Sequence, residues 1–131
     1  MTTSSSSTES VDLSQHIDQT GITTGPRKLA LFRRAISLRE VPLTEANLDD
    51  EGNTISPIFR VKFFDPSGSM TWYVQDWDGA DTCFGYVTGT EYPEYGYFSL
   101  SELSEIKGPF GIGIEVDVHF QPVQSSEIVT A

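Results

Sequence analysis

The period of the apolar residues changes at Pro57, and this change limits the folds open to the chain. Before it, the apolar side chains of residues 29–38 share one half of a helical wheel, which predicts an amphipathic helix. Gly25-Pro26 marks its start, because proline suits the first helical position. Lys28 and Arg39 fall on the apolar side near the helix ends, where we expect their long aliphatic chains to place the charged groups in solvent.

After Pro57 the period is two, which predicts strands. Turn signals at residues 65–68 and 76–81 separate the first three, so these strands are expected to be antiparallel. Ser99 and Glu102 form a capping box that predicts a second, short helix over residues 100–107. The predicted strands cover residues 58–64, 70–75, 82–88, 97–98 and 112–121. The fold class is therefore α+β, with an N-terminal amphipathic helix packed on an antiparallel β meander and a short second helix before the last strand.

Tight turns would fix the register of this meander. Lys62 would then face Trp72, as a cation–π contact, and Trp72 would face Gly85. A slip of one residue would reverse the two faces. The opposite face is expected to carry Phe59, Val61, Phe63, Tyr73, Phe84 and Tyr86.

The two ends of the chain differ in composition from the middle. Residues 1–24 are rich in Ser and Thr and show no apolar period, so we expect a disordered tail. Residues 25–123 are expected to form a single α+β domain, and residues 124–131 a flexible C-terminal end.

The charge of the chain excludes some partners. Eight Lys and Arg stand against nineteen Asp and Glu, for a formal charge of −11 and a pI near 4.3. Such a surface disfavours direct binding of nucleic acids and of anionic membranes. There is no apolar run long enough to span a membrane. The single cysteine, Cys83, fits a reducing compartment, so we expect a cytoplasmic protein.

Three polar residues alternate along the last predicted strand. Glu115, Asp117 and His119 would share one strand face, either as an acid/base or metal cluster or as the wet side of an edge strand. The wet edge is favoured, because solvated charge is the commoner use of such a pattern. Elsewhere, Cys83 and His119 would form a nucleophile pair only if the fold brought them within hydrogen-bond reach.

No cofactor and no metal site are predicted. Asp76, Asp78 and Asp81 surround Gly79 but lack the ligand spacing of a calcium loop, so they favour a hairpin turn. Aromatic residues in or near loops are better candidates for binding, since Tyr and Trp are enriched at protein interfaces. These are Trp77, Tyr92 and Tyr95, with Tyr97 beside them.

Four segments together resemble a known family. They are residues 57–64, 71–74 and 81–87, and a fourth that is the most specific. It runs Glu94-Tyr95-Gly96-Tyr97-Phe98-Ser99-Leu100-Ser101-Glu102-Leu103, through Gly108-Pro109-Phe110-Gly111, to Ile114-Glu115-Val116-Asp117-Val118-His119-Phe120. Over residues 57–121 the chain resembles the domain of unknown function 2958, a family of small bacterial proteins borne by plasmids and phages. The resemblance implies a mobile-element setting and no particular reaction.

Two functional hypotheses follow. In the first, the protein is a non-catalytic module that binds a host, plasmid or phage protein through its acidic and aromatic surface, as a DNA mimic or in a counter-defence role. Its candidate binding residues are Glu115, Asp117, His119, Trp77, Tyr92 and Tyr95. In the second, it is a small metal-dependent or acid/base enzyme that uses Glu115, Asp117 and His119. The two hypotheses differ in whether those three side chains line a pocket or a flat edge.

Overall fold

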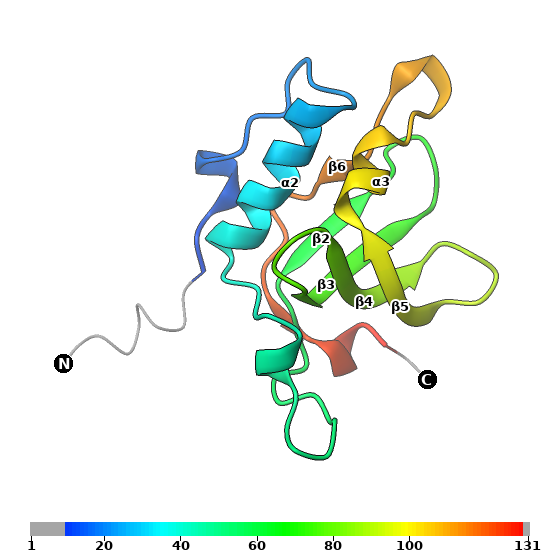
Figure 1. The fold of residues 1–131 in the computed structure, drawn as a ribbon. Coiled ribbons are helices and arrows are strands. Elements are labelled where there is room, and N and C mark those ends of the chain that lie inside the picture. The colour runs from blue at the N-terminus through cyan, green and yellow to red at the C-terminus, as the bar shows by residue number, and fades with distance from the viewer. Residues whose placement is uncertain (1–9, 130–131) are drawn as a thin grey trace.

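The computed structural model describes residues 10–129, in which both α-helices lie on one side of an antiparallel sheet (Figure 1). The sheet has five strands in the order β5-β4-β3-β2-β6, and β1 pairs with β7 in a separate two-stranded sheet. The elements are η1 (Leu13–Gln15), α2 (Pro26–Leu38), η2 (Glu45–Asn47), β1 (Ile58–Phe59), β2 (Val61–Phe64), β3 (Thr71–Trp77), β4 (Thr82–Thr88), β5 (Glu94–Ser99), α3 (Leu100–Glu105), η3 (Pro109–Gly111), β6 (Glu115–Val116), β7 (Val123–Gln124) and η4 (Ser125–Glu127). The predicted α+β class is confirmed.

Both predicted helices are present. Pro26 occupies the first turn of α2, and Ser99 caps α3 by accepting a hydrogen bond from the N–H of Glu102 at 3.2 Å. None of the helices in residues 10–129 has the length and apolar character that crossing a membrane takes.

The core lies between α2 and one face of the sheet. Phe32 of α2 packs on Phe63 of β2, with ring centroids 4.6 Å apart. The sheet's contribution to this core comes from Val61, Phe63, Trp72, Val74, Cys83 and Val116.

The predicted register is wrong by one residue between the first two strands. Lys62 pairs with Tyr73, because the N–H of Asp65 donates to Met70 and leaves four residues, 66–69, in the turn. This slip moves Trp72 to the core face, beside Val61 and Phe63, and turns Tyr73 outward. The cation–π contact of Lys62 is accordingly with Tyr73, at 5.9 Å.

Gly85 does not lie opposite Trp72 either. It pairs with Val74, next to a bulge between Val74 and Asp76. A Cβ at Gly85 would lie 1.7 Å from the carbonyl oxygen of Tyr73, so a close approach of two backbones requires glycine there.

The flexible tail predicted over residues 1–24 does not hold for residues 10–24. Leu13 and Ile17 are buried in the core, because their spacing of four places both on one side of the short helical segment. Asp12 caps η1 by accepting a hydrogen bond from the N–H of Ser14. Residues 1–9 of the predicted tail lie outside the described residues.

The predicted C-terminal end is also ordered as far as residue 129. Gln124 pairs with Ile58, and the N–H of Ser125 donates to Pro57. Residues 130–131 lie outside the described part.

Two basic side chains of α2 depart from the prediction that they reach water. Lys28 is 1% exposed and Arg39 is 2% exposed. Arg39 donates to the carbonyl oxygens of Val11 and Arg60. These residues lie outside α2, so a helical wheel of α2 alone could not show that they enclose the guanidinium.

Candidate functional site

The face of the sheet opposite α2 carries a row of aromatic rings. Tyr73 of β3, Phe84 and Tyr86 of β4, and Tyr95 and Tyr97 of β5 alternate with core-facing residues and therefore point to the same side. The row is continuous across three strands. Its ring centroids are 5.0 Å apart for Phe84–Tyr97, 5.7 Å for Phe84–Tyr95, 5.2 Å for Tyr86–Tyr95 and 6.3 Å for Phe59–Tyr86.

One end of this aromatic row is anchored and the other is open to solvent. Phe59 is fully buried and stacks on Tyr73 with ring centroids 5.4 Å apart, and Phe120 packs on Tyr73 with ring centroids 5.9 Å apart. Tyr95 is 40% exposed and Tyr97 is 70% exposed. The outer rings are thus held in place by packing yet remain available for contact.

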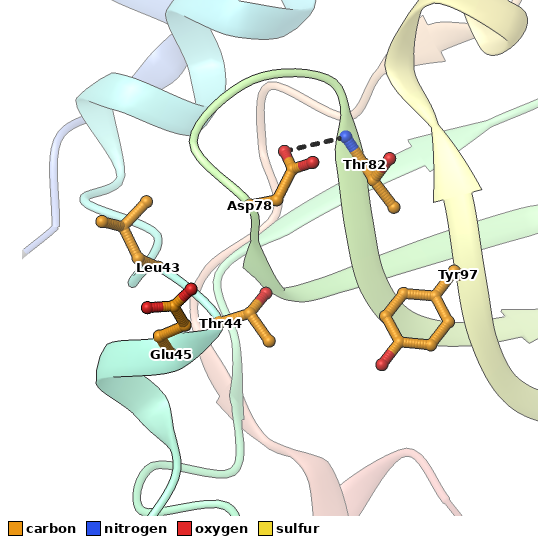
Figure 2. Close-up of a pocket in the computed structure, with 6 residues that line it drawn as sticks. All are labelled: Leu43, Thr44, Glu45, Asp78, Thr82 and Tyr97. Atoms are coloured by element: carbon orange, nitrogen blue, oxygen red, sulfur yellow. Dashed lines mark hydrogen bonds between the residues drawn. The ribbon is translucent and has the colours of Figure 1, made fainter.

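Two hollows of about 420 Å³ each adjoin the row. The first has Tyr97 on one side and carboxylates on the other, and Figure 2 shows the six residues that line it: Leu43, Thr44, Glu45, Asp78, Thr82 and Tyr97. The second is lined by Thr54, Pro57, Gln75, Phe84 and Tyr95. Phe84 contacts both Tyr95 and Tyr97, so the rings separate the two hollows.

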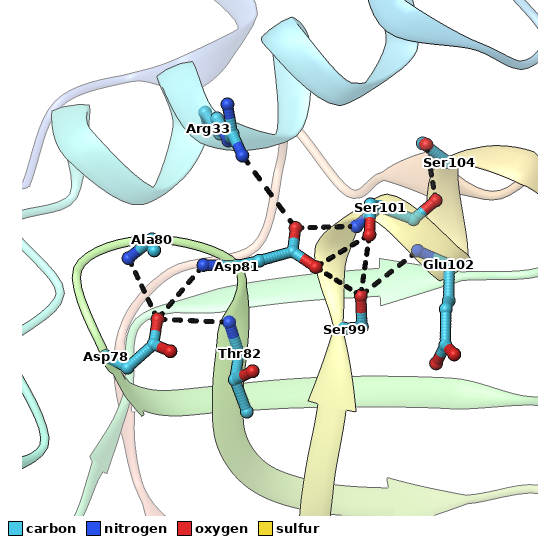
Figure 3. A network of polar contacts seen from close by, with 9 residues as sticks. All are labelled: Arg33, Asp78, Ala80, Asp81, Thr82, Ser99, Ser101, Glu102 and Ser104. Atoms are coloured by element: carbon cyan, nitrogen blue, oxygen red, sulfur yellow. Dashed lines mark hydrogen bonds and ion pairs between the residues drawn. The ribbon is translucent and has the colours of Figure 1, made fainter.

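The aspartates around Gly79 build the turn that the sequence predicts. One oxygen of Asp78 accepts from the backbone N–H groups of Ala80, Asp81 and Thr82 at 2.8–3.1 Å (Figure 3). These bonds, first that from Ala80, lower the pKa of Asp78. The carboxylate is therefore ionised at neutral pH.

Asp81 ties this turn to α3 (Figure 3). It accepts from the hydroxyls of Ser99 and Ser101 at 2.5 and 2.6 Å, and Arg33 of α2 lies 3.9 Å away. Burial opposes ionisation, but the hydrogen bonds from Ser101 and Ser99 outweigh it and lower the pKa of Asp81. The serines serve as partners of a structural carboxylate, and among residues 10–129 neither forms a hydrogen bond with a histidine.

Asp76 holds the segment around η2 against the end of β3. It is buried and accepts from the Thr44 hydroxyl at 2.8 Å and from the Asn47 amide at 3.3 Å. The three aspartates thus hold three separate pieces of structure. Within residues 10–129 there is no group of three or more His, Cys, Asp or Glu side chains placed to hold a metal ion.

The structure does not bring Glu115, Asp117 and His119 onto one strand face. Glu115 lies in β6, but that strand ends at Val116, and the N–H of Phe120 donates to Asp117 in a turn. Asp117 forms an ion pair with Lys62 at 3.5 Å and accepts from the backbone N–H of His119. The prediction of a long closing strand over residues 112–121 is therefore wrong, since only Glu115 and Val116 form a strand. The chain turns after Val116 because the side chain of Asp117 accepts a hydrogen bond from the N–H of His119.

Cys83 and His119 lie in different environments. Cys83 is fully buried in the core, and burial, with Asp78, Asp81 and Asp76 adding to it, raises the pKa of its thiol. His119 is exposed in the turn after β6. A protonated core thiol and an exposed imidazole do not make a nucleophile pair.

The predicted aromatic binding residues are divided by the fold. Tyr95 lies in the aromatic row. Tyr92 is 75% exposed in the loop that precedes β5, outside the ring contacts of the row. Trp77 packs against the core, and its backbone bonds to Pro42 and Thr44.

The sequence predicted part of this row, because it placed Phe59, Tyr73, Phe84 and Tyr86 on one face of the meander, but it did not bring Tyr95 and Tyr97 of β5 beside them. Phe84 and Tyr86, and Tyr95 and Tyr97, each show aromatic residues two apart in a strand. Once the strands are paired, these doublets fall side by side.

Comparison with known proteins places the chain in a family but gives no function. Neither the curated proteins nor the solved structures include a match. Residues 36–128, from the last turn of α2 to just after η4, match the family described as "Protein of unknown function (DUF2958)". The match spans more than half of the chain, and the protein therefore belongs to this family.

Proposed function

We propose that this protein is a non-catalytic binding module that recognises another polypeptide through the aromatic row and the hollows beside it. The observation that carries the proposal is the exposed end of the row at Tyr95 and Tyr97. Tyrosines whose rings are held in place by packing against other aromatic rings are typical of the residues that dominate the binding energy of protein interfaces. Exposed apolar groups gathered on one face are also typical of interaction sites.

The charge of the chain supports a polypeptide partner over a nucleic acid. Exposed aromatic rings on a sheet also suit stacking with unpaired bases, but such sites need a basic groove along the phosphates. Here the first hollow has Glu45 and Asp78, and the chain carries a formal charge of −11. The acidic surroundings would repel phosphates and attract a basic segment.

The setting of the partner is part of the same proposal. The resemblance of the sequence to proteins of plasmids and phages suggests a host, plasmid or phage protein in the cytoplasm. An acidic surface that competes with DNA for such a protein is consistent with this setting.

The enzyme hypothesis has no comparable support. It required Glu115, Asp117 and His119 to act together, whereas these side chains occupy a short strand, an ion pair and an exposed turn. We therefore carry only the binding module forward.

Crosslinking inside the producing cell tests the proposal. A photoreactive benzoylphenylalanine in place of Tyr97 should form covalent adducts with a polypeptide. The same group in place of Ser37, which is exposed on α2 at the opposite side of the sheet, should not. Adducts that form equally from both positions, or from neither, would contradict the proposed function.

A further inference from the structure

We propose that β5 is a docking edge, at which an extended, basic segment of the partner adds as a further strand of the sheet. This inference rests on the proposed function and deepens it, because it names the chemistry of the partner and the way in which it binds.

The first support is the geometry of the edge. β5 is the last strand of the sheet order, and among residues 10–129 it pairs only with β4. The N–H of Leu100 donates to the carbonyl of Asp81 at 2.8 Å, which fixes the phase of the ladder. Because backbone groups alternate in direction along an antiparallel pair, those of Gly96 and Phe98 point to β4, and those of Tyr95 and Tyr97 point outward. Within residues 10–129, no backbone hydrogen bond takes up the outward groups of Tyr95 and Tyr97.

The other edge of the sheet, at β6, has its outward backbone groups at Val116 occupied by a side chain. β6 is only two residues long, and the side chain of Gln19 covers it. The amide of Gln19 accepts from the N–H of Val116 at 2.8 Å and donates to its carbonyl at 3.0 Å, as a neighbouring strand would.

β5 lacks most of the features that block pairing, although Glu94 places one charge at its start and Pro93 directly precedes it. It runs for six residues, Glu94–Ser99, without a lysine, a proline or a bulge against β4. An open edge of that length invites pairing with another chain, and proteins ordinarily protect it. A strand used for recognition must instead stay open, since main-chain hydrogen bonds supply the affinity in strand addition.

The charge beside this edge selects the occupant. Alternate side chains of an added strand would lie on the face that carries Tyr95 and Tyr97. On that face, on the β4 side of Tyr97, the hollow lined by Tyr97, Glu45 and Asp78 offers an aromatic ring and two carboxylates (Figure 2). An arginine or lysine suits both, because a guanidinium stacks on a ring and pairs with carboxylates. A second copy of this chain is a poorer occupant, because each copy carries a formal charge of −11.

Synthetic peptides test the inference directly. The probe is a labelled ten-residue peptide that alternates arginine with valine, titrated by fluorescence anisotropy at 150 mM salt. Its matched control is the same peptide with N-methyl groups on alternate residues, which keeps the charge and removes the pairing edge. We expect the methylated peptide to bind about tenfold more weakly, the effect of losing two or so hydrogen bonds. A peptide alternating glutamate with valine should not bind.

Two substitutions of Tyr97 distinguish the contribution of backbone pairing at the edge from that of the aromatic ring. Tyr97→Thr and Tyr97→Pro both remove the ring, but only proline also removes the outward N–H, in a place where an edge strand tolerates it. Strand addition predicts that Tyr97→Pro binds the arginine peptide more weakly than Tyr97→Thr. Glu45→Gln alters no hydrogen bond among residues 10–129, and it should also weaken the binding of the arginine peptide.

The outcomes distinguish this inference from the proposed function. Equal affinity for the plain and methylated peptides, no binding of either, or equal affinity of the two Tyr97 variants would overturn strand addition. So would a dimer of the parent that Tyr97→Pro makes monomeric, because the occupant would then be a second copy. None of these results affects crosslinking from position 97, and the loss of those crosslinks would overturn the proposed function itself.

Discussion

Replacing Gln19 with alanine should destabilise the whole domain, although Gln19 lies in a segment with little apolar character. Its amide makes two hydrogen bonds to Val116 and accepts one from the ammonium of Lys28 at 3.4 Å. Each backbone bond contributes about 1 kcal/mol net, and a buried charged group that loses its partner costs about 1–3 kcal/mol. The sum is about 3–5 kcal/mol, which is a large part of the stability of a small domain.

Thermal unfolding followed by circular dichroism measures this effect, and we expect the melting temperature to fall by roughly 10 °C. Gln124→Ala is the matched control, because it removes the same amide from an exposed position and should leave the melting temperature nearly unchanged. Hydrogen exchange of the Val116 amide gives a second readout, since Gln19→Ala removes its acceptor. A variant that melts like the parent and still protects the Val116 amide would refute the reasoning that residues 10–24 belong to the fold.

Three further predictions concern buried or ionised side chains. Lys28→Met should raise the melting temperature at pH 7, because it replaces a buried ammonium, whose pKa burial lowers, with an apolar chain of similar length. In the parent, stability should increase as the pH rises through the lowered pKa of Lys28 toward 10.5, and denaturant titrations of Lys28→Met should lack that rise. Cys83 should react with a thiol reagent only when the protein unfolds, so that rapid labelling of the native protein would contradict its burial. Asp81→Ala should lower the melting temperature at neutral pH and reduce the loss of stability that the parent shows below pH 3.8, where protonation of Asp81 breaks its bonds to Ser99 and Ser101.

Local signals predicted the elements well. Pro26, the N-cap at Ser99 and the turn at Asp78 each depend on residues a few positions away, and each lies where the sequence placed it. Of the predicted capping box, the bond from the N–H of Glu102 to the Ser99 hydroxyl is present. Such short-range chemistry is readable from one sequence because its partners are neighbours in the chain.

The errors arose where partners are distant. The register of β2 and β3 depends on one extra residue in the turn, and the burial of Arg39 depends on Val11 and Arg60. Leu13 and Ile17 carry a helical spacing, but two apolar residues in a polar segment do not reveal which surface they cover. The closing strand was overextended because alternation persists through Asp117, where a side-chain hydrogen bond turns the chain instead.

The same limit applies to the candidate site. Tyr95 was predicted from its type and its position near a loop, whereas the aromatic row exists only once β3, β4 and β5 are paired. Glu115, Asp117 and His119 were grouped by spacing alone, and the turn at Asp117 separates them.

The most direct test of the binding-module account is the affinity of the crosslinked partner, once purified, for Tyr97→Ser measured by calorimetry. Tyr97 is 70% exposed and contributes mainly a ring contact with Phe84, so the variant should fold and melt like the parent. A tyrosine at the centre of an interface is worth about 2 kcal/mol or more, which corresponds to an affinity about thirtyfold weaker. Tyr92→Ser removes an equally exposed ring outside the row and should change the affinity much less. The account predicts this difference between the two variants, and a Tyr97→Ser protein that binds its partner as tightly as the parent would contradict it.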